Sequence, residues 1–403
     1  MKDSIQRLPQ RPRPDWPAQL EHIGFHFHSI DEHGNDARND AIKTGRFHYW
    51  REDIAYVFTE QQIETLYEAG CEAHHMCVDL ARDLVRRGDL DRLMIPTHAQ
   101  GWIETSLRRG DPSLYGRFDF SWTGEGTPKL LEYNADTPTS LIESSVAQWF
   151  WKERVQPEAD QFNSIHEALI ERWKVIAAHH GTQRLHLAGS LDSQEDVGNL
   201  EYLMDTALQA GLAASMLDVG GIGATDEGQY VDAQGEALRM AFKLYPWEWM
   251  VLEDFSQFIP VSNTAWIEPI WKMVLSNKAI LPLLWEQHPG HPLLLPASFH
   301  ADSFSGKRCV KKPLLSREGA NVSLLDDGLP LMSVEGAYGQ EGFIYQDYAP
   351  VARFQSNEPG MPSAVHAVLG AWIVGDEAVG LCVREDASPV TRNTSYFVPH
   401  YFL

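Results

Sequence analysis

One feature constrains this chain more than any other: two short apolar segments that carry charged and amide side chains at alternate positions. The first segment reads RFDF from Arg117, and the second reads LLEYN and ends at Asn134. Side chains two residues apart on a strand point to one face, so Glu132 and Asn134 are expected to project together, with Asp119 on the partner strand. Paired strands would then gather three oxygen donors of the kind that Mg²⁺ prefers, beside an arginine able to hold an anion. Spacing alone leaves an ordinary hairpin with a salt bridge as an equally good interpretation.

After the second segment, the apolar pattern breaks at Thr137–Pro138–Thr139–Ser140 and continues at the spacing of an amphipathic helix over about residues 138–152. The expected site therefore opens where a strand ends and a helix begins. Helix N-termini bind anions readily because their first backbone N–H groups lack partners within the helix.

The composition limits the size and the partners of the chain. Its 403 residues are enough for two or three packed lobes, and its hydrophobic fraction of 43% is normal for a globular protein. The formal net charge is −23, from 56 acidic and 33 basic residues. This charge argues against nucleic acid or an anionic membrane as a partner, and it suits a small-molecule substrate that carries an amine. The oligomeric state stays open.

The four cysteines are scattered and match no zinc-binding spacing, so a reducing, cytoplasmic compartment is expected. The N-terminus lacks the apolar region of a secretory signal, and no run of about 18 apolar residues predicts a membrane span. Residues 1–48 are interpreted as an N-terminal arm, extended and proline-rich at its start. Of its histidines, His22, His26, His28 and His33, the middle two could bind a metal, but ordinary surface or core residues are the favoured interpretation.

Helical spacing of apolar residues predicts a long helix capped by Thr59 and ended by Gly88. A strand–helix–strand pattern over about residues 183–225 predicts a small lobe with ligands at the carboxyl ends of its strands. At such an end, Glu195 and Asp196 either cap the helix or face a cationic substrate, and capping is favoured without more information. Further helices are expected over about residues 99–108 and 157–180, and further strands over about 293–296, 309–314, 322–325, 342–347, 364–375 and 377–384.

The C-terminal third contains lysines and a small-residue loop that suit a polyphosphate. Lys278 stands alone before an apolar helix, and Lys312 lies on a strand that leads into the loop Leu315–Asn321. The lysine can neutralise a polyphosphate while the amides of a glycine-containing loop donate to its oxygens. A plain hairpin is the alternative. The Walker pattern and the protein-kinase signatures are absent from the sequence.

Together, an oxygen-ligand metal site, two separated lysines, a glycine loop between strands and a nearby arginine describe an enzyme that uses a nucleotide polyphosphate. Antiparallel strands around such a loop are how ATP-grasp enzymes hold ATP. From about Tyr49 to the C-terminus, the sequence resembles the synthetase domain of the glutathionylspermidine synthase family, and more closely its stand-alone acid–amine ligase-like members. The motifs that carry the resemblance are Arg117–Asp119 with Glu132–Asp136, Asn277–Pro282, Val310–Pro313, Ile344–Gln346 and Val383–Asp386.

The resemblance implies a role for each matching residue. Arg117 matches the catalytic arginine that stabilises the transferring phosphoryl group. The positions that match the Mg²⁺ ligands are Asp119, Glu132 and Asn134, and those that match the ATP site are Lys278, Lys312, Ser316, Gly319, Tyr345, Gln346, Asp347 and Arg384. The positions that match the substrate sites are Thr137, Thr139 and Ser140 for the acid, and Glu195 and Asp196 for the amine.

The resemblance also implies a fold. An α/β (α+β) ATP-grasp-like synthetase domain with a small βαβ, preATP-grasp-like lobe is expected over residues 49–403. The ATP-grasp lobes are expected at about residues 110–150 and 265–403. Because the chain begins at the synthetase, no amidase domain is expected before it.

The implied reaction is the ATP- and Mg²⁺-dependent ligation of a carboxylic acid to an amine through an acyl phosphate. The alternatives are a nucleotide-binding scaffold without catalysis and a carboxylate kinase without an amine acceptor. The sequence departs from spermidine-using relatives at Thr137–Ser140 and in the loop Ser316–Asn321. These departures leave open which acid and amine are used, including glutathione and spermidine.

Overall fold

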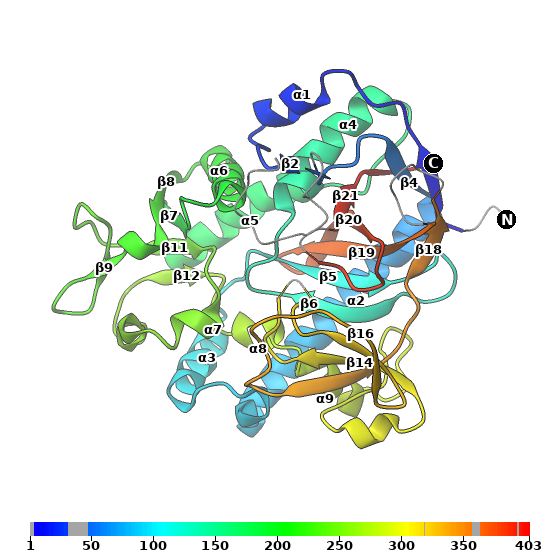
Figure 1. Cartoon of the computed structure of the whole chain (residues 1–403). Coiled ribbons are helices and arrows are strands. Elements are labelled where there is room, and N and C mark those ends of the chain that lie inside the picture. The colour runs from blue at the N-terminus through cyan, green and yellow to red at the C-terminus, as the bar shows by residue number, and fades with distance from the viewer. Residues whose placement is uncertain (1–3, 31–46, 318, 357–362, 393–394) are drawn as a thin grey trace.

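The RFDF and LLEYN segments form adjacent antiparallel strands, β5 (Tyr115–Ser121) and β6 (Lys129–Asn134). A computed structural model describes residues 4–30, 47–317, 319–356, 363–392 and 395–403 of the protein (Figure 1). The two strands form one edge of a sheet with the order β21-β20-β19-β5-β6, in which β18 also pairs with β19. Its other strands are β18 (Ala352–Gln355), β19 (Ala364–Val374), β20 (Glu377–Asp386) and β21 (Tyr396–Val398).

A second, antiparallel sheet lies beside β6 (Figure 1). Its order is β13-β17-β14-β15-β16, and its strands are β13 (Ala297–Ser298), β14 (Arg308–Pro313), β15 (Ser323–Asp326), β16 (Leu329–Ser333) and β17 (Phe343–Asp347). Side chains of this sheet bind the backbone of β6: Lys312 donates to the Leu131 carbonyl at 2.7 Å, and Gln346 donates to the Leu130 carbonyl at 3.0 Å. The expected phosphate-binding sheet and the expected metal-binding hairpin are therefore in direct contact.

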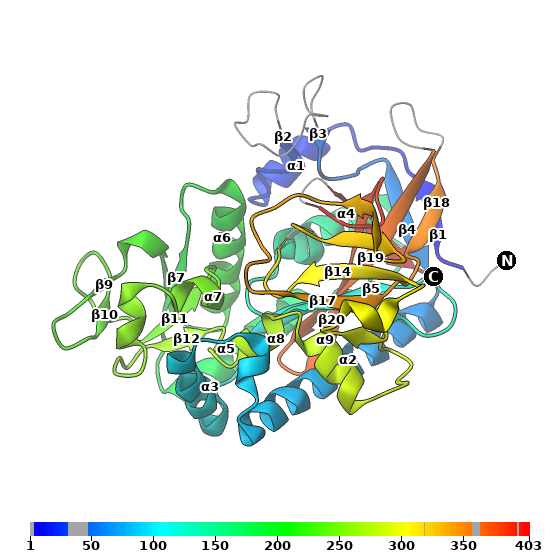
Figure 2. The ribbon, with the colours of Figure 1, turned by 60° about the horizontal axis from the view of Figure 1, so that its bottom comes forward.

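The predicted strand–helix–strand unit forms part of a separate small lobe (green in Figures 1 and 2). Its parallel sheet has the order β12-β11-β7-β8, and α6 connects β7 to β8. The elements of the lobe are α5 (Ile165–His180), β7 (Arg184–Gly189), α6 (Gln194–Gln209), β8 (Ala213–Asp218), β11 (Met240–Lys243) and β12 (Ala265–Ile267).

The long helix predicted between Thr59 and Gly88 is α2 (Glu60–Arg87). The Thr59 hydroxyl accepts from the Gln62 N–H at 3.2 Å and the Gln62 side chain accepts from the Thr59 N–H at 3.0 Å, while Gly88 ends the helix at φ +74°. The other α-helices of the described residues are α1 (Trp16–His22), α3 (Thr97–Arg109), α4 (Gln148–Val155), α7 (Trp247–Met250), α8 (Lys272–Ser276) and α9 (Ile280–Gln287). In the described part of the chain, no helix is long and apolar enough to span a lipid bilayer.

The N-terminal region is more structured than an extended arm. Strand β1 (Gln6–Pro9) pairs with β4 (Ile54–Phe58), which also pairs in parallel with β22 (His400–Phe402). A buried ion pair joins Arg7 Nε to Glu385 Oε2 at 2.5 Å, and α1 follows. Residues 6–9 are therefore held by β4 and by an ion pair to β20, near the C-terminus.

Two expected elements differ from the structure. No strand forms over residues 293–296, and β13 begins only at Ala297. Pro292 precedes this segment and Pro296 ends it, and a proline cannot donate to a sheet ladder. The helix expected from residue 157 begins at Ile165, after turns that include Pro157.

The helix expected over residues 138–152 contains a π-helical turn at Glu143–Ala147 before α4. Two serine hydroxyls bind carbonyl groups four residues earlier, Ser144 at 2.5 Å and Ser145 at 2.7 Å. Such side-chain bonds compete with the regular helical ladder, and π-turns are frequent at functional sites.

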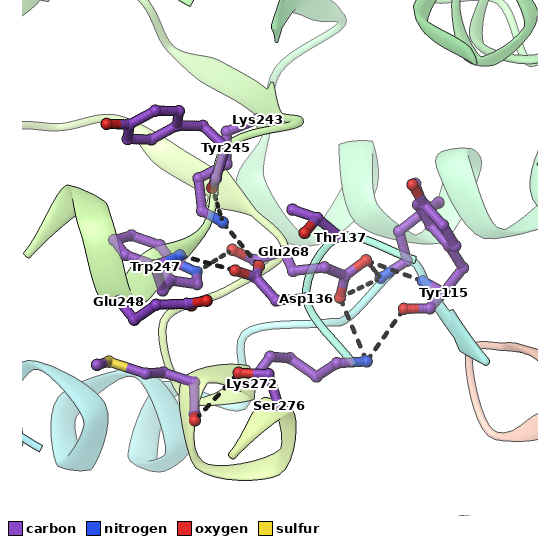
Figure 3. A network of polar contacts seen from close by, with 12 residues as sticks. Tyr115, Asp136, Thr137, Lys243, Tyr245, Trp247, Glu248, Glu268, Lys272 and Ser276 are labelled. Atoms are coloured by element: carbon purple, nitrogen blue, oxygen red, sulfur yellow. Dashed lines mark hydrogen bonds and ion pairs between the residues drawn. The ribbon is translucent and has the colours of Figure 1, made fainter. Parts of the chain in front are cut away.

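Two buried ion pairs join the small lobe to the β5–β6 hairpin, and the first is centred on Asp136 (Figure 3). Asp136 follows β6 and is 1% exposed. Its Oδ1 accepts from Lys243 Nζ, at the end of β11, at 2.7 Å, and its Oδ2 accepts from the Trp247 N–H at 2.8 Å. This pair fixes the segment that follows the LLEYN strand.

The second ion pair is centred on Glu268, which follows β12. Its Oε1 accepts from the N–H groups of Leu114 and Tyr115 at 3.0 and 2.9 Å, and Lys272 Nζ lies 3.6 Å from Oε2 (Figure 3). Burial raises the pKa of Glu268 and lowers the pKa of Lys272, and each opposite charge acts against the other group's shift. The pair therefore fixes the start of β5 to the small lobe.

We expect Asp136→Asn to destabilise the protein by about 3–5 kcal/mol, because it leaves the charge of Lys243 buried without a counterion. The measurement is guanidinium unfolding followed by tryptophan fluorescence. The matched control is Asp326→Asn, which removes an ion pair with Arg308 whose side chains are 48% and 47% exposed, and it should cost about 1 kcal/mol or less. Equal losses of unfolding free energy in the two variants would contradict the role of Asp136 in joining the small lobe to the hairpin.

Candidate functional site

The hairpin register brings the predicted charged residues together. Arg117 lies opposite Asn134, and Asp119 lies opposite Glu132. Arg117 donates to both oxygens of Asp119, from Nε at 2.7 Å and from Nη2 at 3.2 Å, while Asn134 Nδ2 lies 3.4 Å from Asp119 Oδ2. The predicted common face is present, and a salt bridge lies within it.

The two predicted lysines reach this hairpin from the C-terminal third of the chain. Lys278 Nζ lies 3.1 Å from Glu132 Oε2 and donates to the Ser316 carbonyl at 2.6 Å. Lys312 donates to Gln346 Oε1 at 2.8 Å as well as to the backbone of β6. Both lysines are buried, so their charges act in a medium that screens them weakly.

The charges shift the ionisation of two of these groups. Burial alone would raise the pKa of Glu132, but the charges of Lys278 and Lys312 outweigh it and lower the pKa to about 2. Burial, reinforced by the charge of Lys278, lowers the pKa of Lys312 to about 8. The site thus keeps its carboxylate ionised and contains a lysine whose proton is weakly held.

The donor set fits a hard divalent cation. Asp119 and Glu132 supply carboxylate oxygens and Asn134 supplies a carboxamide oxygen, which are the ligand types that Mg²⁺ takes together with phosphate and water. Among the described residues, no three histidine, cysteine, aspartate or glutamate side chains are grouped to hold a metal. A third protein ligand would therefore be the amide of Asn134.

A cavity begins at this charged cluster and extends between the two antiparallel sheets. Asp119, Glu132 and Lys312 of the cluster line it. Its walls are largely apolar and include Val310, Val322, Leu324, Val351 and Val368. An apolar cavity with a few charged groups suits an aromatic base that carries an anionic chain.

Only part of the segment expected to contact adenine, Tyr345–Asp347, lines the cavity. Gln346 and Asp347 line the cavity, but Tyr345 does not. The Gln346 side chain is used to hold Lys312, so it positions that lysine. Tyr348, the next residue, lines the cavity and was missed, because its place after the strand end leaves no periodic signal in the sequence.

The glycine loop covers the charged end of the cavity. Ser316 and Gly319 line it, and Gly319 has φ +72°. A Cβ at Gly319 would lie 2.6 Å from the Thr391 carbonyl oxygen, so no larger residue fits without movement. Next to Ser316, Arg317 leaves the cavity and donates to the Thr137 hydroxyl at 2.6 Å.

The segment expected to bind the acid is positioned by Arg117 and Tyr49. Arg117 Nη1 donates to the Thr139 carbonyl at 2.6 Å. Ser140 has φ +71°, a strained conformation for a residue with a side chain, and its hydroxyl lies 3.1 Å from the Tyr49 hydroxyl. The segment is therefore held next to the hairpin by residues from three parts of the chain.

Glu143 is a buried carboxylate beside this segment that was missed from the sequence. It is fully buried on the π-helical turn, and Tyr49 donates to its Oε1 at 2.8 Å. Its Oε2 has no hydrogen-bond partner in the described residues. Burial, together with the charge of Glu195, raises the pKa of Glu143 to about 7. An acidic residue within the helical SLIESS segment was the only signal, and it is also what a solvated helix face would show.

Two other predicted residues, Glu195 and Arg384, lie near Glu143, whereas Asp196 does not contact it. The charges of Glu195 and Arg384 both act on Glu143, and Arg384 does not line the cavity that Asp119, Glu132 and Lys312 line. Asp196 serves the loop instead: its Oδ2 accepts from the Ser190 N–H at 3.1 Å, and its own N–H donates to the N-cap Ser193 at 3.2 Å. Asp196 therefore stabilises the start of α6 and the loop before it, and Glu195 is the acidic residue whose charge acts on Glu143.

The N-terminal histidines are not grouped with other metal-ligating side chains in the part of the chain that is described. His28 is buried, with Nδ1 2.8 Å from the Ser29 hydroxyl and its ring 5.2 Å from that of Trp16. His33 lies outside the described residues.

Comparison with known proteins finds relatives along most of the chain. A Haemophilus influenzae protein with the provisional name acid–amine ligase is 39% identical over 403 aligned residues, which cover 97% of this chain and 98% of that protein. The trypanothione synthetase of Crithidia fasciculata is 25% identical over 91% of this chain, and the bifunctional glutathionylspermidine synthetase/amidase of Escherichia coli is 24% identical over 90%. This chain spans 58% and 60% of those two longer proteins.

The fold also occurs in a solved structure. A glutathione synthetase-like effector of Globodera pallida matches with a TM-score of 0.57 over 98% of this chain and 100% of that chain, at 9% identity. This match confirms the expected α/β class and fold. Residues 7–403 match the family described as glutathionylspermidine synthase preATP-grasp. The chain therefore belongs to the glutathionylspermidine synthase family of ATP-dependent amide-bond ligases.

Proposed function

We propose that this protein is an Mg²⁺- and ATP-dependent ligase that joins a small carboxylic acid to a small amine through an acyl phosphate. The observation that carries the proposal is the meeting of Arg117, Asp119, Glu132, Lys278 and Lys312, three of which (Asp119, Glu132 and Lys312) line an apolar cavity. Family membership supports ATP-dependent ligation, and four free thiols support a reducing compartment such as the cytoplasm.

In the first step, a carboxylate oxygen of the acid bonds to the γ-phosphorus of ATP, and the bond to the bridging oxygen of ADP breaks. Arg117, Lys278 and Lys312 supply fixed positive charge around the oxygens that gain charge. Asp119, Glu132 and Asn134 would hold Mg²⁺, which neutralises phosphate charge when bound. The protein groups thus orient the phosphates and exclude water.

In the second step, the amine nitrogen bonds to the acyl carbon and phosphate leaves. The neutral amine attacks through its lone pair, so the nitrogen becomes positively charged as the bond forms and must then lose a proton. Glu143 is a buried carboxylate with one oxygen that no described residue binds. Glu195 adds a second negative charge nearby, and Arg384 balances the pair. We assign Glu143 to hold the amine or to accept its proton.

The alternatives are a scaffold that binds nucleotide without catalysis and a carboxylate kinase. The complete set of charged residues argues against the scaffold, because a buried arginine and two buried lysines are costly to keep without use. The second acidic group, Glu143 beside Glu195, argues against a kinase without an amine acceptor.

We expect ADP release to require both an acid and an amine. Screening a panel of acids and amines by coupled ADP release, with mass detection of the amide, measures this requirement. ADP release with an acid alone would indicate a kinase. ATP binding without ADP release for any pair would indicate the scaffold.

Glu132→Gln should lower ADP release in the full reaction by about a hundredfold or more, because it removes a charged ligand and frees Lys278 from its pair. The matched control is Glu286→Gln, which removes an exposed ion pair with Arg92 and should leave the rate unchanged. Circular dichroism establishes that both variants fold. Near-normal turnover of Glu132→Gln would refute the metal assignment.

The pH dependence of kcat/KM for the amine should follow the ionisation of Glu143. Since burial raises the pKa of this acid to about 7, kcat/KM for the amine should rise as the pH increases through about 7 and Glu143 ionises. In Glu143→Gln this limb should disappear and the rate should fall, while the KM for ATP stays the same. A limb that persists in Glu143→Gln belongs to another group and would overturn the assignment.

A further inference from the structure

The arginine of the glycine loop is bound at the acid end of the site. Arg317 donates from Nε and Nη2 to Glu248 Oε1 at 3.1 and 2.9 Å, and from Nη1 to Thr137 Oγ1 at 2.6 Å. Its guanidinium also lies 5.8 Å from the centre of the Trp249 ring. Every guanidinium nitrogen is thus used away from the phosphate end of the cavity.

Glu248 is fixed independently of the loop. It lies on α7 directly after Trp247, whose N–H donates to the buried Asp136 (Figure 3). Glu248 is 6% exposed, and its Oε2 is buried without a hydrogen-bond partner in the described residues. A buried carboxylate attracts a cation strongly, so this rigid anion determines where the loop arginine rests.

The loop connects this contact to the phosphate end. The Ser316 carbonyl accepts from Lys278, which pairs with Glu132, and Arg317 is the next residue. Thr137 lies three residues beyond Asn134, at the position assigned to the acid. An acid that binds the Thr137 hydroxyl must therefore replace the bond from Arg317.

We propose that Glu248 is a positioning residue that withholds Arg317 from the phosphates until the acid substrate binds at Thr137. The released arginine then turns toward the transferring phosphoryl group, so phosphoryl transfer depends on the acid. This inference rests on the proposed ligase function. It assigns to Glu248 the suppression of ATP hydrolysis without acid.

The suppressed reaction is simple hydrolysis. The oxygen of water bonds to the γ-phosphorus and the bond to the bridging oxygen of ADP breaks, which gives ADP, phosphate and a proton. Arg317 near the γ-phosphate would promote this reaction as readily as transfer to an acid, because it stabilises the same charge.

The test measures ADP release from Mg²⁺-ATP in the absence of any acid or amine. Glu248→Gln keeps the shape of the side chain but not its charge, and it should raise this basal rate about tenfold, the worth of a charge-assisted hydrogen bond. Glu248→Gln/Arg317→Gln should return to the wild-type rate. The matched control is Glu253→Gln, an exposed glutamate five residues further along, which should leave the basal rate unchanged.

A second readout does not depend on turnover. Hydrogen exchange of the loop peptide over residues 314–322, measured without ATP, should be faster in Glu248→Gln and in Arg317→Gln than in the wild type and Glu253→Gln. Glu248→Gln/Arg317→Gln also serves if Glu248→Gln fails to fold, because it removes both charges of the pair and leaves neither one buried without a counterion.

An unchanged basal rate and unchanged loop exchange in Glu248→Gln, in protein that binds ATP, would overturn the role of Glu248 and leave the ligase proposal standing. A rise that persists in the double variant would also overturn it, because the effect would not act through Arg317. Wild-type protein that does not bind ATP in calorimetry would overturn both proposals.

Discussion

The structure depends on the compensation of buried carboxylates. Asp119 is buried and Glu132 is partly buried, with its side chain 27% exposed, and an ionised carboxylate in such a place is unfavourable without a counterion. Arg117 forms an ion pair with Asp119 from the same strand, and Lys278 forms one with Glu132 from a segment far along the chain. The hairpin is therefore stable in its charged form only when the C-terminal third packs against it.

The same requirement joins the small lobe to the hairpin. Asp136 is buried two residues beyond Asn134, and its counterion Lys243 comes from the small lobe. Glu268 and Lys272 repeat the arrangement at the other end of the hairpin, at the start of β5. Ion pairs of this kind contribute less to stability than to a specific geometry, and here they fix the relative positions of the hairpin's sheet and the parallel sheet of the small lobe.

Cations that now bind protein oxygens are suited to bind phosphate instead. Lys278, Lys312 and Arg317 each donate to a backbone carbonyl or a hydroxyl, acceptors that are weaker than phosphate oxygens. Ligand binding can exchange these partners without building new charge into the site. This arrangement agrees with membership in a family of ATP-dependent ligases.

Local sequence determined the elements and the ligand types. The helix between Thr59 and Gly88 and the alternation of RFDF and LLEYN were readable because capping and period-two patterns act over a few residues. The start of the helix at Ile165 was predicted too early, because residues around Pro157 form turns where a helix was expected. The motif order also indicated the family before any fold was known.

Tertiary structure alone decided which charges meet. Nothing in the spacing of the chain places Glu248 against Arg317, turns Tyr345 away from the cavity, or leaves an oxygen of Glu143 buried beside Tyr49. Each of these outcomes depends on burial and on contacts between residues more than 60 positions apart, as for Arg317 and Glu248 at a separation of 69. Sequence by itself thus determined the strands and the chemistry they carry, and packing decided the counterion of each charge, because the cost of burial appears only when the lobes close on one another.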